Sequence, residues 1–595
     1  MDAVARAMEV SAQLTAPGAP FELTVREKRG QALPVYRHAP QSLAAVVEQA
    51  RRDDDVCFMV YRQDRWSFKR FFAELDALCH WLHEAGVGPG SAVAIACRNR
   101  PEWVVAFCAL ARIGAVPAPL NSFGKQEELL AAINDIQPEL LICDKDRLRR
   151  LSQPNPQADA NGAVIKLPPL LLIGNQSQTE QACISPDASI PSVKNGGVTG
   201  HITEYGQVIS SYLDQPPLPL PVCHTDDPAL ILFTSGATSR AKAVLSSQQA
   251  VCQALFNIDY ISALSAMTSP DIVKNIMARA CEPVILTAVP LFHVSGLHAQ
   301  LLTALRTGRR LVFMHKWEPV QALETMRQER VTQFNGAPSM VMQLLREPAF
   351  FAPDILDNFS GLGFGGAGLP ETLVELVLDK LPQQMVGIGF GMTETNGVGS
   401  AVSGDLFRGA PKSSGVISPL IEVQITNPIG EVMPVGQTGE VCLKGITVMD
   451  EYVGNPAATA DTIRNGWLHT GDLGYLDDNR FLFIVDRLKD VINRAGENIA
   501  AAEVESCLLR HTAVREAAVF GVPDEETGEA VVAVVSVVSS AVDEQQLRDH
   551  VAGILAAYKV PSRIHILAQN LPRNPAGKLL RSQLKQTYST DTATA

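Results

Sequence analysis

Apolar and polar positions along the chain predict strands that alternate with helices. From Ala92, the apolar run AVAIAC is followed by a helix-like stretch at 102–113, the strand-like AVPAPLN, the helical KQEELLAAINDI and the strand-like LLIC. The alternation returns later in ALILFT, VILTAV and RLVFM, with a helical pattern at 318–330. Short apolar runs between helices of ten or more residues are typical of a parallel sheet covered by helices. We therefore expect an α/β fold.

The pattern changes at two places. Between about 152 and 226, Asn, Gln, Ser and Gly dominate and PPLPLP occupies 216–221, which predicts an irregular surface insertion. Near Asp486 a smaller α/β unit of roughly 100 residues begins, with a helix-like 503–510 and the strand-like VVAVVSVV. We expect a large N-terminal domain of helix-covered sheets at 1–488 and a small, mobile C-terminal α/β domain at 489–595.

Composition excludes several classes of protein. Of 595 residues, 46% are apolar and 19% are charged, unlike a disordered chain or a coiled coil. The net charge of −13 with no Lys/Arg block disfavours nucleic acid as a partner. The 11 cysteines are scattered, which favours reduced thiols over a zinc knuckle or a disulfide framework. The N-terminal residues lack the apolar run of a signal peptide, and the apolar stretch 530–542 is too short to span a bilayer. We expect a soluble cytoplasmic protein with no integral membrane segment.

Two glycine-rich stretches have the composition of nucleotide-binding loops. In LFTSGATSRAKAV, 232–244, a strand leads into hydroxyl and glycine residues and a lysine, which suits phosphate oxygens. It lacks the spacing of a Walker loop. In GIGFGMTETNG, 387–397, Phe390 offers a stacking face and Glu394 a hard oxygen ligand for magnesium. Taken singly, each stretch has an ordinary interpretation as a polar turn.

Two later stretches add charged side chains. In GWLHTGDLGYLDDNRFLFIVDRLKDVI, 466–492, Asp472 sits in a Thr-Gly-Asp turn where its carboxylate could accept two ribose hydroxyls, and Arg487 follows. In LPRNPAGKLLR, 571–581, Lys578 follows a Pro/Gly turn. A lysine in such a place is usually a solvated surface residue.

Together, the order and spacing of the four stretches resemble the adenylate-forming superfamily, which includes acyl-CoA and aryl-CoA synthetases, peptide-synthetase adenylation domains and firefly luciferase. The resemblance covers about 42–585. Further matching segments are PLFHVSG (290–296), VTQFNGAP (331–338), GGAGLP (365–370), TGEVCLKG (438–445), AGENIAAAEVE (495–505) and AAVFGVPDEETGE (517–529).

The resemblance implies a ligase with two half-reactions. A carboxylate would attack the α-phosphate of ATP, giving an acyl-adenylate and pyrophosphate, and coenzyme A would then displace AMP. Lys578 matches the catalytic lysine that bridges the two anionic reactants. Mg²⁺ would be held by Glu394 with help from Thr234. The phosphate loop of the family corresponds here to Thr234, Ser235, Gly236, Thr238 and Lys242.

The remaining roles also follow from the resemblance. Adenine would lie between Gly366–Ala367 and Phe390, and Asp472 and Arg487 would hold the ribose. Gly391, Met392 and Thr393 belong to the same nucleotide motif, and His293 lines the acyl site. The C-terminal domain would rotate about a hinge at Lys489, which brings a loop of Gly496, Glu497 and Asn498 to the coenzyme A tunnel.

The phosphate loop departs from the family pattern. Ala237, Ser239, Ala241 and Ala243 stand where Thr, Gly, Pro and Gly are usual. The lost threonine removes one phosphate donor, and serine in place of glycine costs about 1 kcal/mol if that residue needs a positive φ. The altered loop leaves open a relative that binds nucleotide but is catalytically impaired.

The acid is only loosely predicted. His293 stands where amino-acid-activating relatives have an aspartate, so an α-amino acid is disfavoured. The small side chains of Val294, Ser295, Gly296 and Ala299 favour a medium- or long-chain or bulky apolar acyl group. Two questions stay open: whether a carrier-protein thiol replaces coenzyme A, as in acyl-AMP ligases, and whether the chain forms a homodimer.

Overall fold

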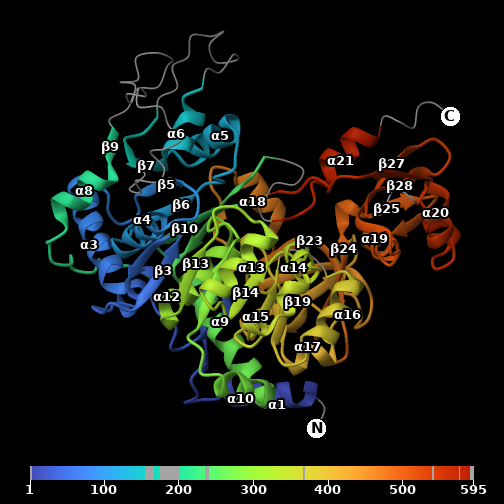
Figure 1. Ribbon diagram of the computed structural model, residues 1–595, viewed down its shortest axis with the longest axis horizontal. Helices are drawn as coiled ribbons and strands as arrows, with labels where there is room; N and C mark the ends of the chain where they lie inside the picture. The colour runs from blue at the N-terminus through green and yellow to red at the C-terminus, as the bar shows by residue number, and fades with distance from the viewer. Residues whose placement is uncertain are drawn as a thin grey trace.

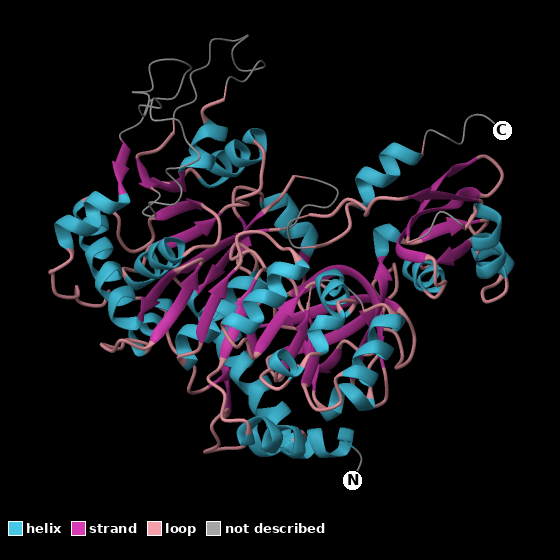
Figure 2. Cartoon of the chain, in the orientation of Figure 1, coloured by secondary structure: helices cyan, strands magenta, loops and turns pink. Residues whose placement is uncertain are grey.

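The computed structural model describes residues 3–153, 167–174, 202–234, 240–365, 369–538, 542–574 and 577–589. A large body of helix-covered sheets holds most of the chain, and a smaller C-terminal unit, orange to red in Figure 1, lies to one side of it. Helices cover the sheets of both parts (Figure 2). The expected α/β class is confirmed.

The first sheet is parallel throughout, with strand order β6-β5-β7-β8-β9. Its strands are β5 (Ala92–Ala96), β6 (Val116–Pro119), β7 (Leu140–Asp144), β8 (Leu170–Ile173) and β9 (Ile202–Glu204). The accompanying helices are α3 (Phe68–Glu84), α4 (Pro101–Arg112), α5 (Gln126–Ile136), α6 (Lys145–Leu151) and α8 (Tyr205–Tyr212).

The second sheet is larger and mixed, with the order β19-β20-β23-β24-β18-β17-β16-β15-β14-β12-β13-β3-β4 and β22 paired to β23. Its parallel part is β3 (Cys57–Tyr61), β12 (Val284–Thr287), β13 (Arg310–Phe313), β14 (Gln333–Gly336), β15 (Gly361–Phe364) and β16 (Met385–Phe390). Its antiparallel part is β4 (Asp64–Ser67), β17 (Ser400–Ser403), β18 (Gly415–Ile417), β19 (Ile421–Thr426), β20 (Gly439–Gly445), β22 (Ile463–Arg464), β23 (Trp467–Leu476) and β24 (Phe481–Arg487).

Smaller elements complete the large body. A three-stranded sheet consists of β10 (Pro228–Phe233), β11 (Ala243–Ser247) and β21 (Glu451–Tyr452), and a hairpin of β1 (Leu23–Lys28) and β2 (Gln31–Tyr36). The remaining helices are α1 (Ala3–Thr15), α2 (Leu43–Gln49), α9 (Gln248–Thr268), α10 (Pro270–Ala278), α11 (Val294–Gly296), the π-helix η2 (Leu297–Leu302), α12 (Thr303–Thr307), α13 (Pro319–Gln328), α14 (Pro338–Leu345), η3 (Pro348–Phe351), α15 (Pro353–Leu356), α16 (Glu371–Lys380), η4 (Thr393–Thr395), α17 (Asp405–Gly409) and α18 (Pro456–Thr462).

The C-terminal unit has its own sheet and its own core. Strands β26-β25-β28-β27 are joined by β29, which pairs in parallel with β28. The elements are η5 (Leu488–Asp490), β25 (Ile492–Arg494), β26 (Glu497–Ile499), α19 (Ala501–Leu509), β27 (Val514–Asp524), β28 (Gly528–Val537), α20 (Glu544–Ala552), η6 (Ala557–Lys559), β29 (Arg563–Leu567) and α21 (Arg581–Tyr588). Four residues separate the end of β24 from the start of this sheet at Ile492. The predicted domain boundary at 488/489 falls between them and stays a prediction.

Two apolar helices lie in the core of the large body. Every residue of α4 is buried, and Trp103 stacks on Phe107 with ring centroids 5.4 Å apart, as expected for a helix that is apolar all round. Helix α9 is long and apolar enough to cross a membrane by length and composition, but more than half of its most apolar window is buried inside the protein. Its apolarity is explained by its packing against β10 and α1.

The prediction of an irregular insertion at 152–226 is wrong for part of that segment. Leu170–Ile173 forms the buried strand β8, and β9 and α8 follow, with Tyr205 donating to the Glu74 carboxylate at 2.8 Å. A four-residue strand between polar stretches gives too short a periodicity to be recognised. The PPLPLP stretch at 216–221 has no regular structure, as expected.

Candidate active site

Lys578 lies on a turn of the C-terminal unit that is docked against the large body. The backbone oxygen of Gly577 accepts a hydrogen bond from Ser339 Oγ at 3.3 Å, at the start of α14. Asn574 braces the turn: its Oδ1 accepts from Lys578 N at 2.9 Å, and its own N donates to Lys578 O. The start of α14 and the Lys578 turn therefore meet, although Ser339 and Gly577 are 238 residues apart, and this contact fixes the start of the Lys578 side chain.

The charges around Lys578 are those that the sequence predicted. Burial lowers the pKa of the Lys578 ammonium group, and so does the nearby positive charge of Arg487. The carboxylates of Asp472 and Glu394 act in the opposite direction and raise this pKa. The structure thus brings together four charged side chains from three separate stretches of sequence.

Asp472 and Arg487 face each other across the β23–β24 ladder. They are register partners, and Arg487 Nε lies 3.1 Å from Asp472 Oδ1. Asp472 is buried, which raises the pKa of its carboxyl group, while the charges of Arg487 and Lys578 lower it. Arg487 itself remains exposed on its outer side. The pair offers hydrogen-bond acceptors and donors to a diol at the edge of the sheet.

Glu394 is a buried carboxylate on the short helix η4. Its Oε1 accepts a hydrogen bond from Tyr452 Oη at 2.7 Å, and it makes no ion pair with any residue in the described part of the chain. A buried carboxylate that makes no direct ion pair is costly. This observation fits a divalent cation at Glu394, since Mg²⁺ prefers carboxylate oxygen.

The two ends of the predicted phosphate loop are tied together beside Glu394. Thr234 and Lys242 exchange two hydrogen bonds of 3.0 Å, one of them from Lys242 N to Thr234 Oγ1. Lys242 Nζ lies 4.4 Å from the centre of the Tyr452 ring, the same tyrosine that binds Glu394. The predicted loop residues Ser235, Gly236 and Thr238, and the substituted positions Ala237 and Ser239, lie outside the described residues, as do Gly366 and Ala367.

The predicted adenine-binding residues lie at the end of β16 and just after it. Phe390 is half-buried at the last position of that strand. A Cβ atom on Gly391 would come within 2.2 Å of Gly397 O, so the chain crosses itself too closely there for any side chain. Met392 and Thr393 lead into η4 and thereby link the adenine position to Glu394.

The predicted acyl segment starts at His293. Burial lowers the pKa of His293 to about 4, with a further contribution from the charge of Lys578, so its ring is neutral at neutral pH. We expected Gly296 to leave room for the acyl group, but this is wrong. A Cβ atom on Gly296 would lie 2.3 Å from Pro290 O, so the glycine allows close packing of the backbone. Val294 and Ala299 are half-buried and Ser295 is exposed.

The predicted hinge and coenzyme A loop lie on the C-terminal side. Lys489 is in η5, and partial desolvation together with Arg487 lowers its pKa. Gly496, with φ +86°, turns the chain between β25 and β26, and Glu497 and Asn498 are exposed with it. Among the described residues, no atom beyond its chain neighbours lies within 4 Å of the place where a Gly496 Cβ would stand.

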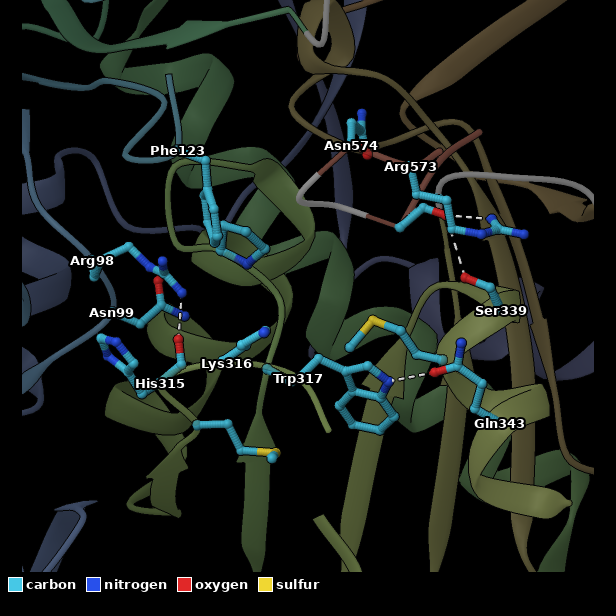
Figure 3. Close-up of a pocket in the computed structure, with 15 residues that line it drawn as sticks. Arg98, Asn99, Phe123, His315, Lys316, Trp317, Ser339, Gln343, Arg573 and Asn574 are labelled. Carbon is cyan, nitrogen blue, oxygen red and sulfur yellow. Dashed lines mark hydrogen bonds between the residues drawn. The ribbon is translucent and has the colours of Figure 1, made fainter. Parts of the chain in front are cut away.

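A cavity of about 260 Å³ adjoins the Lys578 turn. Residues after β5, β6, β12 and β13 line one side, and Arg573, Asn574 and Gly577 line the other (Figure 3). Arg98 lies over the Phe123 ring, 3.8 Å from its centre, and donates to His315 O. Burial lowers the pKa of Arg98, and Arg147 adds to this effect. Neither Arg98 nor Lys316 forms an ion pair with a carboxylate in the described ranges, so this cavity has a cationic wall.

The family models match the two parts of the chain separately. Residues 46–453 match "AMP-binding enzyme" and residues 503–578 match "AMP-binding enzyme C-terminal domain". The chain belongs to the AMP-binding enzyme family. It is an AMP-forming acid–thiol ligase, and the reactants of this family are ATP, with Mg²⁺, and coenzyme A.

Relatives of this family member act on different acids. A long-chain-fatty-acid–CoA ligase, FadD13 of Mycobacterium tuberculosis, is 30% identical over 87% of this chain and 93% of its own length. A 4-coumarate–CoA ligase of Arabidopsis thaliana is 30% identical over 93% and 91%. Among solved structures, ATP-bound MatB from Rhodopseudomonas palustris is 25% identical with a TM-score of 0.75, covering 92% of this chain and 99% of its own.

Sequence reasoning missed Tyr452, Ser339 and Asn574. Tyr452 follows the TGEVCLKG stretch, whose glycines and apolar residues carry no sign that a nearby tyrosine reaches Glu394. Asn574 and Ser339 act through the backbone of the Lys578 turn, and only the docking of the two units gives them a role.

Proposed function

We propose that the enzyme activates a medium- or long-chain or bulky apolar carboxylic acid as its acyl-adenylate and then transfers the acyl group to coenzyme A. The observation that carries the proposal is the position of Lys578, within electrostatic reach of Asp472, Glu394 and Arg487 at the family's nucleotide motifs.

The first half-reaction needs positive charge between two anions. A carboxylate oxygen of the acid attacks the α-phosphorus of ATP, the bond to the bridging oxygen breaks, and pyrophosphate leaves. Lys578 would contact both the attacking carboxylate and the α-phosphate, so its ammonium offsets their repulsion. Asp472 and Arg487 would orient the ribose, and Lys242 would meet the outgoing phosphates. Magnesium at Glu394 and Thr234, when bound, neutralises phosphate charge.

The apolar acid is supported by the surroundings of His293. Its ring is neutral, and the following residues at 294–299 include no carboxylate that could pair with an amino group. These features favour an uncharged acyl chain over an α-amino acid.

Coenzyme A as acceptor is supported by the cationic wall of the cavity beside the Lys578 turn. Arg98 and Lys316 lack acidic partners in the part of the chain that is described, and together they suit the phosphates of the nucleotide half of coenzyme A. The C-terminal unit would rotate about Lys489 to withdraw Lys578 and bring Gly496 to the thiol. A reducing compartment, as in the cytoplasm, suits the free cysteines of the described residues.

The test of this proposal separates the two half-reactions. In Lys578→Ala, acid-dependent ATP–pyrophosphate exchange should fall by about 100-fold or more, since a preorganised charge at the reacting phosphate is lost. Attack of coenzyme A on supplied acyl-adenylate should stay within about threefold of the wild type, because that step does not use the lysine. Lys585→Ala, an exposed lysine of α21, is the matched control. Equal loss of both steps contradicts the proposal, and an absence of exchange with every acid in a panel of chain lengths and ring acids shows an impaired relative.

A second experiment addresses the acceptor. Lys316→Ala should raise the KM for coenzyme A severalfold while the KM for pantetheine, which lacks the phosphates, stays unchanged. Lys69→Ala, an exposed lysine at the start of α3, should change neither value. An equal rise for both thiols, or turnover only with a phosphopantetheine-bearing carrier protein, would argue for the carrier-protein alternative.

A further inference from the structure

The Thr-Gly-Asp turn that carries Asp472 is a bulge in β23. Cys442 pairs with His469 and Glu440 with Leu473, so Val441 of β20 faces three residues, Thr470 to Asp472. Gly471 at the centre has φ +70°, in the left-handed region. Bulges change the direction in which a side chain points and are common beside active sites. The place of the Asp472 carboxylate therefore depends on what holds this bulge.

The Glu440 carboxylate contacts the bulge in β23 at two points. Its Oε1 accepts a hydrogen bond from Gly471 N at 3.1 Å, inside the bulge. Its Oε2 accepts from His469 Nδ1 at 2.8 Å, just before the bulge. A carboxylate that receives one donor from each side fixes the backbone between them.

The Thr470 hydroxyl provides the other hydrogen bonds that hold the bulge. Its hydroxyl donates to Val441 O at 2.7 Å and accepts from Asp472 N at 3.1 Å. The donors of the bulge are thereby used within the sheet, and Asp472 faces Arg487 on β24 with its carboxylate at 3.1 Å. The Cys442 Sγ atom lies 3.4 Å from His469 Nδ1. Burial raises the pKa of the Cys442 thiol to about 11, so this side chain stays uncharged within the sheet.

We propose that Glu440 is a positioning residue for nucleotide recognition, because it clamps the bulge that aims the Asp472 carboxylate at the ribose. Glu440 does not touch the nucleotide in this proposal. The inference rests on the proposed role of Asp472 in holding the ribose hydroxyls.

The test measures discrimination between ATP and its 2′-deoxy and 3′-deoxy analogues in pyrophosphate exchange. A charged hydrogen bond to a ribose hydroxyl gives the wild type a preference of about tenfold or more in kcat/KM for ATP. In Glu440→Ala this preference should shrink toward that of Asp472→Ala, because the carboxylate is no longer aimed. A merely structural defect would lower kcat/KM for all three nucleotides by the same factor and leave their ratio unchanged.

Two further variants sharpen the result. Glu440→Gln keeps an oxygen for Gly471 N and a polar group for His469, so it should restore most of the preference. Glu422→Ala, which removes an exposed partner of Lys444 two strands away, should leave the preference intact. If Glu440→Ala does not fold by circular dichroism, Thr470→Val provides the same test of the bulge with almost no change in volume.

The outcomes separate the proposed role of Asp472 from the proposed role of Glu440. If Asp472→Ala leaves the ribose preference unchanged, the proposed role of Asp472 fails. If Asp472→Ala abolishes the preference while Glu440→Ala and Thr470→Val both retain it, the positioning role of Glu440 is overturned and the proposed function stands.

Discussion

Tyr452 joins the two charged side chains that the phosphates of ATP would meet. Its hydroxyl donates to Glu394, and its ring faces the Lys242 ammonium. Burial and the Glu394 charge raise the pKa of the Tyr452 phenol, so the group stays protonated and can act only as a donor to the carboxylate. It therefore orients a proposed metal ligand.

Tyr452→Phe should raise the Mg²⁺ concentration needed for half-maximal pyrophosphate exchange by about tenfold, since partners that orient metal ligands contribute on that order to affinity. The ring for Lys242 is kept, so the rate at saturating Mg²⁺ should fall much less. Tyr475→Phe, which keeps its ring stacked on Phe483, is the control. An unchanged Mg²⁺ dependence would show that the hydroxyl does not orient the ligand.

At the same scale, the sequence singled out the four charged side chains that the structure brings together, but not the residues that support them. Lys578, Asp472, Arg487 and Glu394 have distinctive contexts and lie together as expected. Gly296 was interpreted as an opening for substrate, yet the backbone of Pro290 occupies that space. Glycine is favoured both where two backbone segments approach closely and where space is left open for a ligand, and only the structure distinguishes these two cases.

The turn of the C-terminal unit carries Lys578, the proposed catalytic lysine. Gly577 has φ +83°, and a Cβ there would stand 2.7 Å from Ala337 Cβ of the large body. Both strain and steric contact therefore oppose any other residue. The turn and the start of α14 form a close fit that the linear spacing of NGAP and AGK does not reveal.

Gly577→Ala should lower pyrophosphate exchange by about tenfold or more, because the turn must move away from α14 and carry Lys578 with it. Attack of coenzyme A on supplied acyl-adenylate should be unaffected. Gly553→Ala, at the end of α20 with ordinary backbone angles and contacts no closer than 3.4 Å, is the matched glycine control. Loss of the second step as well would indicate that the variant disturbs the fold of the C-terminal unit.

Periodicity predicted part of the elements, among them the helices α4, α5 and α13, but it did not single out the longer helices α3 and α9. It failed at β8 and β9, which have only four and three residues and lie among polar segments. Pairing with β7 buries β8, and this long-range contact leaves no trace in the local pattern.

At the scale of the whole molecule, an exposed ion pair joins the two units. Arg510 at the end of α19 contacts Glu371 at the start of α16, and Glu371 also pairs with Lys412 at 2.6 Å. These charges lower the pKa of the Glu371 carboxyl group. The contact exists in the arrangement that places Lys578 beside Asp472 and Glu394, so in the proposed mechanism it would favour the first half-reaction over the second.

Arg510→Ala should lower pyrophosphate exchange two- to threefold without slowing attack of coenzyme A on the adenylate, since exposed pairs contribute at most about 1 kcal/mol. Added salt should reduce the wild-type rate toward that of the variant. Lys412→Ala removes the partner of Glu371 within the large body and should not change the balance of the two steps. A larger effect from Lys412→Ala than from Arg510→Ala would refute the link between the units.

The cavity beside the Lys578 turn has walls from both units, and this dictates how it would respond to a small inhibitor. A compound that fills the cavity would contact Trp317 and Gln343 of the large body and Arg573 of the C-terminal unit. It would therefore hold the two units in their present arrangement. Such a compound would stall the catalytic cycle at a retained intermediate and compete with the incoming thiol, without competing with ATP.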